Sequence, residues 1–480
     1  MASFVAEFVR IQTSFPPKSH DFGYFPAKSP QFMQDQAVVG GTDSQVAEHP
    51  SAREALRFWA WLGCVSFGGP AGQIAIMHEE VVERKRWVDE RRFSHALSYC
   101  MVLPGPEAQQ LATYLGWLLH GVWGGIAAGL LFILPGFLLL MTLSAVAALG
   151  GEIAWVRAIF RGFEPAVVAV IFVASWRMAK RGLRSGVAWG LAIGAFAALI
   201  GDVPFAVILV VAAIVGWLAK LHPAAHGKSG KANGVDPELP MDEHTARLTS
   251  WSRMLRLAIV FALLWGAVYG LIYFIRGFES VPTQMALFFS EAALLTFGGA
   301  YAVLPYVSEQ AVQANWITPD QVISGLALGE STPGPLILVL TYFGFMGGYQ
   351  STKTSPLSEG IFCGSIATYF TFLPSFAFIL IGAPWIERLR KWQWLTGAMA
   401  GISAAVVGVI LHLGVTVLLR VWWPDSLTRR WDVASLKSVD LFALVLSIAA
   451  GVALVRFRQS VPRVVLAAGL IGLLRWLATS

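Results

Sequence analysis

Charged residues are scarce in this sequence of 480 residues. Only 13% of the residues are Asp, Glu, Lys or Arg, whereas soluble proteins average about 25%. Apolar residues make up 56%, and the mean hydropathy is +0.62. A soluble protein with so little charge would not cover that much apolar surface. The long, unbroken apolar runs also exclude a β-barrel, whose strands alternate in polarity. The composition therefore predicts an all-α polytopic membrane protein.

Cysteines and enzyme motifs are equally sparse. The three cysteines, Cys64, Cys100 and Cys363, lie too far apart in the sequence to indicate a disulfide framework or a metal site. His78-Glu79 resembles the start of a zinc-protease motif, but Val82 occupies the position of the second histidine. The sequence has no phosphate-binding loop, dinucleotide fingerprint or haem-attachment pair. We therefore predict a protein that is not an enzyme, with no catalytic residues, no cofactor and no metal.

We also expect no cleavable signal peptide, because the first 50 residues are polar and contain no apolar h-region. The net charge of +6 comes from basic clusters between apolar runs, which is typical of membrane loops and does not indicate nucleic acid. We expect five regions: a polar N-terminal tail (1–54), a first membrane repeat (55–220), a hydrophilic linker (221–252), a second membrane repeat (253–421) and C-terminal helices (422–480).

About 13 apolar runs are candidates to cross the membrane as helices, for which roughly 20 residues are needed. They lie near 56–77, 96–118, 122–149, 158–179, 184–200, 203–220, 254–275, 284–306, 322–347, 358–382, 397–421, 438–456 and 461–478.

The two halves of the chain share motifs at an offset of about 230 residues, which indicates an internal duplication. An odd number of predicted spans separates the two copies, so we expect the second copy to be inverted in the membrane. The loop 78–92 has five basic residues and its counterpart 307–321 has none, which agrees with inversion. Inverted repeats are common in secondary transporters, whose substrate site lies at the repeat interface. The matching motifs are Phe67-Gly68-Gly69 with Phe297-Gly298-Gly299, Trp87 with Trp316, Pro104-Gly105-Pro106 with Pro333-Gly334-Pro335, and Leu134-Pro135 with Leu373-Pro374.

The duplicated Pro-Gly-Pro motif predicts a broken helix at membrane depth in each half. Proline removes a backbone donor and glycine lets the chain turn. Such breaks are tolerated in a membrane only where they are buried in protein or line a watery cavity. The helix that restarts there directs free N–H groups and the positive end of its dipole inward, which suits an anion. A pair of packing kinks is the alternative.

The duplicated Gly-Gly motif places a hydroxyl residue two positions before the paired glycines, and backbone and hydroxyl donors can coordinate an oxyanion. Close helix packing is the alternative explanation. The predicted substrate-binding residues are Ser66, Gly68, Gly69, Pro104, Gly105, Pro106, Gln109, Thr296, Gly298, Gly299, Thr332, Pro333, Gly334 and Pro335.

Three glutamates lie at or near the predicted breaks. Ionisable residues inside a membrane are functional candidates by default. An ionised carboxylate would repel an anion, so we interpret these residues as candidates for proton coupling and not as ligands. They are Glu107, Glu291 and Glu330.

These motifs resemble the chromate ion transporter family over roughly 55–420. In the first half the resemblance rests on Phe67-Gly68-Gly69-Pro70, the stretch from Glu83 to Trp87, the stretch from Leu103 to Ala112, and Leu134-Pro135-Gly136. In the second half it rests on Phe297-Gly298-Gly299, Trp316 and Thr332-Pro333-Gly334-Pro335. The long members of this family are duplicated inner-membrane proteins of bacteria that export chromate and confer resistance to it.

The resemblance implies a secondary transporter that exports chromate across the bacterial inner membrane. Sulfate is also a tetrahedral dianion of similar size, so a carrier of sulfate or a related oxyanion, working inward, remains the alternative. A chromate-reducing oxidoreductase and a scaffold without transport are less consistent with the motifs. The expected partners are chromate, sulfate as a second substrate, and the lipid bilayer; a homodimer is left open, and nucleic acid is not expected.

Overall fold

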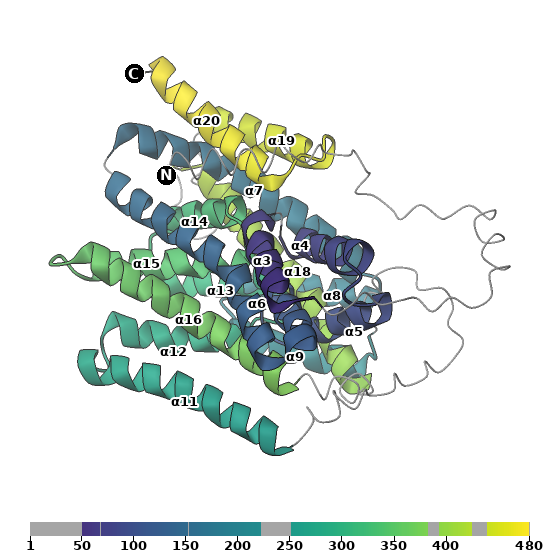
Figure 1. Ribbon diagram of the computed structural model, residues 1–480. Coiled ribbons are helices and arrows are strands. Elements are labelled where there is room, and N and C mark those ends of the chain that lie inside the picture. The colour runs from purple at the N-terminus through teal and green to yellow at the C-terminus, as the bar shows by residue number, and fades with distance from the viewer. Residues whose placement is uncertain are drawn as a thin grey trace. The chain divides into compact units, whose positions relative to one another are not determined.

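The computed structural model describes residues 50–67, 69–151, 153–221, 251–382, 393–424 and 439–479. Most of the predicted tail and linker, and the candidate ligand Gly68, lie outside the described residues. Within them the regular structure is entirely helical, which confirms the predicted all-α class (Figure 1). The helices are α3 (Ala52–Val65), α4 (Gly69–His78), η1 (Glu79–Arg84), α5 (Glu90–Cys100), α6 (Glu107–Gly150), α7 (Ala154–Gly182), α8 (Gly186–Ile200), α9 (Phe205–Leu218), α11 (Trp251–Arg276), α12 (Val281–Leu294), α13 (Ala300–Gln313), α14 (Pro319–Ser331), η2 (Leu336–Leu338), α15 (Val339–Ser351), α16 (Pro356–Gly382), α18 (Gln393–Trp422), α19 (Leu441–Val455) and α20 (Val461–Thr479).

Six of the described helices are long and apolar enough to cross a membrane: α6, α7, α11, α16, α18 and α20. Three more apolar helices, α8, α9 and α19, have only 14 or 15 residues. Many of the large apolar side chains on these helices are exposed, as expected for surfaces that face lipid. The chain is therefore a multi-pass membrane protein.

Four of the apolar runs are each divided in two. The divisions fall at the Gly-Gly and Pro-Gly-Pro motifs, between α3 and α4, α5 and α6, α12 and α13, and α14 and η2. Helix α6 itself consists of two helices that join at His120 and Gly121, where the backbone angles are not helical. The other α-helices next to these divisions have 10 to 14 residues, which corresponds to about 15–21 Å and is too short to cross a bilayer alone. The divisions at the two Pro-Gly-Pro motifs fall where the sequence predicted them. The divisions at the Gly-Gly motifs correct the prediction that 56–77 and 284–306 are each one span.

The duplication is visible in the loop that precedes α5 and in the loop that precedes α14. Arg86 and Asn315 both have positive φ, 53° and 56°. The tryptophan that follows each of them donates its backbone N–H over 2.9 Å, Trp87 to the carbonyl of Val81 and Trp316 to that of Ala311. Two segments 229 residues apart therefore fold into the same turn.

The helix pairs that end the two halves of the chain pack in a reciprocal way. The pair α8 and α9 packs on α18, while the pair α19 and α20 packs on α7 (Figure 1). The turn within each pair contains one residue with positive φ, Asp202 at 55° and Arg458 at 51°. Helix α7 also packs directly on α18. Each long helix therefore packs on a helix pair from the other half of the chain.

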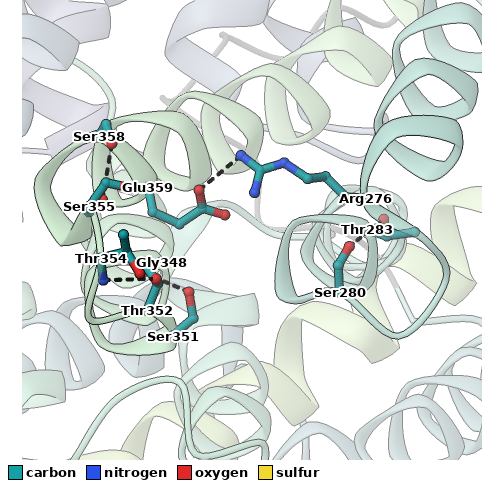
Figure 2. Close-up of polar contacts among 10 residues, drawn as sticks. All are labelled: Arg276, Ser280, Thr283, Gly348, Ser351, Thr352, Thr354, Ser355, Ser358 and Glu359. Atoms are coloured by element: carbon teal, nitrogen blue, oxygen red, sulfur yellow. Dashed lines mark hydrogen bonds and ion pairs between the residues drawn. The ribbon is translucent and has the colours of Figure 1, made fainter.

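Helix α11 is attached to the rest of the protein by polar contacts on one side. Figure 2 shows Arg276 at its end, where the guanidinium contacts the buried carboxylate of Glu359 on α16 at 3.0 Å. Beside this ion pair the hydroxyl oxygens of Ser280 and Thr283 lie 2.8 Å apart. Both also lie within hydrogen-bond distance of the carbonyl oxygen of Gly277, so one hydroxyl can donate to the other while that one donates to Gly277. Farther along α11, the Trp265 indole donates to Ser290 of α12.

Candidate functional site

The backbone at the breaks adopts conformations that favour glycine. The φ angles are 77° at Gly69, 131° at Gly105, 80° at Gly298, 92° at Gly299 and 92° at Gly334. Residues with a Cβ rarely adopt these angles because of clashes with the backbone. The predicted Gly-Gly and Pro-Gly-Pro motifs are therefore points where the chain itself requires glycine.

The breaks of the two halves are joined by exchanged hydrogen bonds. The N–H of Gly105, in the first Pro-Gly-Pro, donates to the carbonyl oxygen of Thr296, just before the second Gly-Gly, at 2.7 Å. The N–H of Gly334, in the second Pro-Gly-Pro, donates to the carbonyl oxygen of Ser66, just before the first Gly-Gly, at 2.9 Å. All four motifs are therefore linked across the duplication.

The proline-containing helices α6 and α16 pack on the breaks in the same crossed pattern. A Cβ on Gly136, which follows Pro135 in α6, would clash with the carbonyl oxygen of Pro333. A Cβ on Gly105 would lie 3.2 Å from the hydroxyl of Ser375, which follows Pro374 in α16. The Leu-Pro segment of each half therefore packs on the Pro-Gly-Pro break of the other half.

The helices that restart at the breaks lack side-chain caps. No side chain accepts from the first turn of α6, α13 or η2. Among the helices that start away from the breaks, α3, α5 and α14 are capped by Ser51, Asp89 and Thr318, whereas α7, α9 and α12 also lack a side-chain cap. The first N–H groups of a helix have no partner within the helix and need a cap, water or a ligand. The three uncapped N-termini at the breaks can therefore receive an oxyanion.

Buried polar side chains surround the breaks. The side chains of Ser66, Thr296, Gln109 and Gln110 are completely inaccessible to solvent. Thr296 donates to the carbonyl of its own helix at Ala292, whereas the hydroxyl of Ser66 has no partner among the described residues. A buried polar group without a partner costs about 1–3 kcal/mol, so it indicates a place for water or ligand.

Gln109 bonds to the second half of the chain, and Gln110 bonds to the first Pro-Gly-Pro. Gln109 donates to Thr113 at 2.9 Å and accepts from the hydroxyl of Ser375 at 2.5 Å. Gln110 donates to the carbonyl of Pro104 at 2.8 Å. Gln109 therefore lies beside the first Pro-Gly-Pro break, and both ends of its amide are bonded to protein groups.

Two of the three predicted carboxylates lie near the start of α13. A Cβ on Gly299 would be 3.6 Å from a carboxylate oxygen of Glu107. The hydroxyl of Tyr301, in the first turn of α13, donates to the buried Glu330 at 2.5 Å. Glu291 is instead exposed on α12 and accepts from Tyr306. Glu107 and Glu330 thus gather at one break, and Glu291 does not join them.

The other predicted residues have local roles. Thr332 is buried and its hydroxyl donates to the carbonyl of Gly329, so it ends α14. Pro106 and Pro335 immediately precede α6 and η2 with extended backbone angles, and their ring nitrogens need no partner. Gly298 faces the hydroxyl of Ser403 on α18, which lies 3.8 Å from the position of a Cβ.

Three further residues at the breaks were not in the predicted set: Gln73, Ser375 and Tyr301. Gln73 is buried in α4, and its amide donates to the carbonyls of both Ser66 and Gly334. In the sequence it is one polar residue inside an apolar run, four positions after Gly69. That isolated position in a membrane segment is the signal that would have identified it.

Comparison with known proteins agrees with this arrangement. A family model described as chromate transporter matches residues 53–217 and 283–473. A chromate transport protein of Pseudomonas aeruginosa is 33% identical over 353 residues, covering 72% of this chain and 76% of the relative. A chromate transport protein of Cupriavidus metallidurans is 24% identical over 429 residues, covering 88% and 93%. A probable chromate transport protein of Synechococcus elongatus is 25% identical over 383 residues, covering 77% and 86%. No solved structure matches the chain.

Proposed function

Because this chain belongs to the chromate transporter family, we propose that it is a secondary transporter that exports chromate across the bacterial inner membrane and so confers chromate resistance. The observation that supports this most directly is the set of uncapped helix N-termini at breaks that are hydrogen-bonded across the duplication. Backbone N–H groups and positive dipole ends suit a small anion whose charge is spread over several oxygens.

The proposal includes two repeats inverted in the membrane, with about 13 crossing segments counted from the apolar runs. The exchanged bonds between Gly105 and Thr296 and between Gly334 and Ser66 support a two-fold relation between the repeats. The reciprocal packing of α8–α9 on α18 and of α19–α20 on α7 supports it as well, and extends the second repeat to α20. Helix α11 would then be the additional segment between the repeats, as its position between the two family segments suggests.

The proposed binding residues are the backbone of the four motifs and the hydroxyl of Ser66. A tetrahedral oxyanion can accept a hydrogen bond at each oxygen, so donors from several helix starts would hold it without any basic side chain. The exchanged bonds would couple the two breaks, so that a movement of one repeat changes the shape of both. This is the geometry that alternating access needs around a fixed site.

Membrane potential is the proposed driving force. A dianion that leaves a cell with a negative interior gains about 2.3 kcal/mol per charge at 100 mV, or about 4.6 kcal/mol for two charges. That free energy corresponds to a gradient of more than about a thousandfold. Export would therefore need neither ATP nor an obligatory proton, whereas uptake of the same ion would need coupling.

Everted membrane vesicles test the proposal. Vesicles that contain the protein should accumulate chromate when the interior is made electrically positive, and vesicles without it should not. Excess sulfate is the competitor, because it is a tetrahedral dianion of similar size. Chromate accumulation that excess sulfate does not abolish supports chromate export. If the vesicles transport sulfate but not chromate, the protein is a sulfate carrier and the proposal of chromate export is wrong.

A further inference from the structure

Gln73 is the side chain that ties the first Gly-Gly break to the second Pro-Gly-Pro break. It is only 1% exposed, and its amide nitrogen lies 3.1 Å from the carbonyl oxygen of Ser66 and 2.6 Å from that of Gly334. The N–H of Gly334 also donates to the Ser66 carbonyl at 2.9 Å. The three groups therefore form a closed ring of hydrogen bonds between the two halves of the chain.

The chemistry of the ring fixes the orientation of the Gln73 amide. Both neighbours are carbonyl oxygens, which only accept, so the NH2 group must face them and uses both of its hydrogens. The side-chain oxygen of Gln73 then faces away, and it is buried without a partner among the described residues. The hydroxyl of Ser66 is likewise buried without a partner. The groups in the ring therefore all have hydrogen-bond partners, whereas the Gln73 side-chain oxygen and the Ser66 hydroxyl beside it can still bond to a ligand or water.

The related pair of breaks is built differently. Val303 occupies the position that corresponds to Gln73, and the hydroxyl of Thr296 is already bonded to Ala292. That break also has the Glu107 carboxylate close to Gly299. Like charges repel, so an oxyanion would avoid an ionised carboxylate there. The two pairs of breaks therefore differ in chemistry although they correspond in the duplication.

We infer that Gln73 is a positioning residue for the oxyanion site, which holds the Ser66 carbonyl and the Gly334 peptide together so that the Ser66 hydroxyl and the start of α4 face the substrate. This inference rests on the proposed function and assigns the anion to the Ser66–Gly334 pair of breaks. Gln73 acts through these two backbone groups, and the groups that touch the anion are the Ser66 hydroxyl and the first N–H groups of α4. The inference thus narrows the proposed site, which drew on the backbone of all four motifs, to one pair of breaks.

Two variants at Gln73 test the inference. Gln73→Leu keeps a similar volume but has no donor, so the Michaelis constant for chromate in everted vesicles should rise about 10- to 100-fold. Gln73→Glu keeps the shape, but the ionised carboxylate faces two carbonyl oxygens, whereas the protonated form can donate one hydrogen bond. Its chromate flux relative to wild type should therefore recover as the pH is lowered.

The controls separate a positioning role from damage to the fold. Gln313→Leu removes an exposed amide on α13 and should leave the Michaelis constant unchanged. Variant-to-wild-type ratios at each pH remove the contribution of the other titratable and charged groups on α4, η1 and α6, namely His78, Glu79, Glu80, Glu83, Arg84, Glu107, Tyr114 and His120. Purified protein gives a second measurement, because chromate should raise the unfolding temperature of wild type more than that of Gln73→Leu.

The outcomes distinguish this inference from the proposed function. If wild type shows neither chromate flux nor a chromate-dependent rise in unfolding temperature, the proposed function is wrong. If wild type shows both and Gln73→Leu matches it in both, the positioning role is overturned. If Gln73→Leu fails to insert into the membrane, Gln73→Glu decides. The inference is overturned if the chromate flux of Gln73→Glu, divided by that of wild type, does not change with pH.

Discussion

The backbone N–H of Gly105 donates to the carbonyl oxygen of Thr296 over 2.7 Å, although the two residues belong to different halves of the chain. The corresponding bond, from Gly334 to Ser66, runs from the second half back to the first. Each half thus supplies one donor and one acceptor. Because the bonds join the places where helices end and restart, the geometry of the breaks depends on contacts that neither half can make alone.

Valine at either Pro-Gly-Pro glycine should abolish transport. Gly105 and Gly334 have φ of 131° and 92°, and a Cβ on Gly105 would lie 2.6 Å from the amide nitrogen of Gln110. A β-branched residue at such angles is strained by about 1–3 kcal/mol before any clash is counted. Chromate flux in vesicles with equal amounts of inserted protein is the measurement. Gly270→Val on α11, where a Cβ meets nothing within 4 Å, is the control. Normal flux through a correctly inserted Gly105→Val or Gly334→Val protein would argue against this site.

Removing the Ser66 hydroxyl should weaken chromate binding without destabilising the protein. The hydroxyl is buried and has no protein partner, so Ser66→Ala deletes no internal hydrogen bond. A hydrogen bond to a charged ligand contributes about 1.5–3 kcal/mol, which corresponds to a rise of about 10- to 100-fold in the Michaelis constant. Thr296→Val is the matched variant, and because its hydroxyl bonds to Ala292 it should lower the unfolding temperature more than the affinity. Equal effects of the two substitutions on affinity would contradict the assignment.

Reporters inserted at Arg86 and Asn315 should lie on opposite sides of the membrane. These residues occupy corresponding turns with positive φ, and each turn connects two helices outside the breaks. Opposite locations follow if the repeats are inverted. Enzymatic or fluorescent tags that are active on only one side of the membrane provide the measurement. The same side for both would mean that the repeats are parallel.

Neutralising the glutamates should distinguish potential from proton coupling. If membrane potential drives export, Glu107→Gln, Glu291→Gln and Glu330→Gln should all keep a potential-driven chromate flux, changed only in affinity. Tyr301→Phe removes the hydrogen bond to Glu330 and serves as its matched variant. Flux is measured in everted vesicles with the potential and the pH gradient collapsed separately. Complete loss of flux when only the pH gradient is collapsed would point to the glutamates.

Breaking the ion pair of α11 should destabilise the protein while leaving chromate affinity intact. Arg276→Ala leaves the carboxylate of Glu359, whose side chain is 9% exposed, without its cation. The expected cost is about 1–3 kcal/mol, which is less than for a fully buried pair because Arg276 is 44% exposed. Glu359→Gln, which leaves no unpaired buried charge, should cost less. Unfolding temperature and the Michaelis constant are the two measurements, and a large change in the latter would place α11 nearer to the transport path than proposed.

The two breaks at the Pro-Gly-Pro motifs were predictable from the sequence because proline and glycine act on their own backbone, and they end α5 and α14 as expected. The breaks that end α3 and α12 at the Gly-Gly motifs were not predicted, since the runs 56–77 and 284–306 were each expected to be one span. The exchange of bonds between the halves was not predictable, since it depends on contacts between residues up to 268 positions apart. For the same reason Gln73 was missed, as its two acceptors, one of them in the other half, are visible only in the fold. Glu291 was predicted at a break from its spacing alone, but the side of α12 on which it lies pairs it with Tyr306.

The exchanged bonds also bear on how such a chain arose. A single-copy ancestor could have closed these breaks only by pairing with a second molecule of itself, because donor and acceptor never belong to the same copy. Fusion into one gene removed the need for the two copies to stay identical. The residues that correspond to Glu107 and Glu330 are Leu336 and Met101, so the carboxylates are found in one copy only at each position. The two copies thus share the Gly-Gly and Pro-Gly-Pro motifs that form the breaks, but they differ in the ionisable residues beside them.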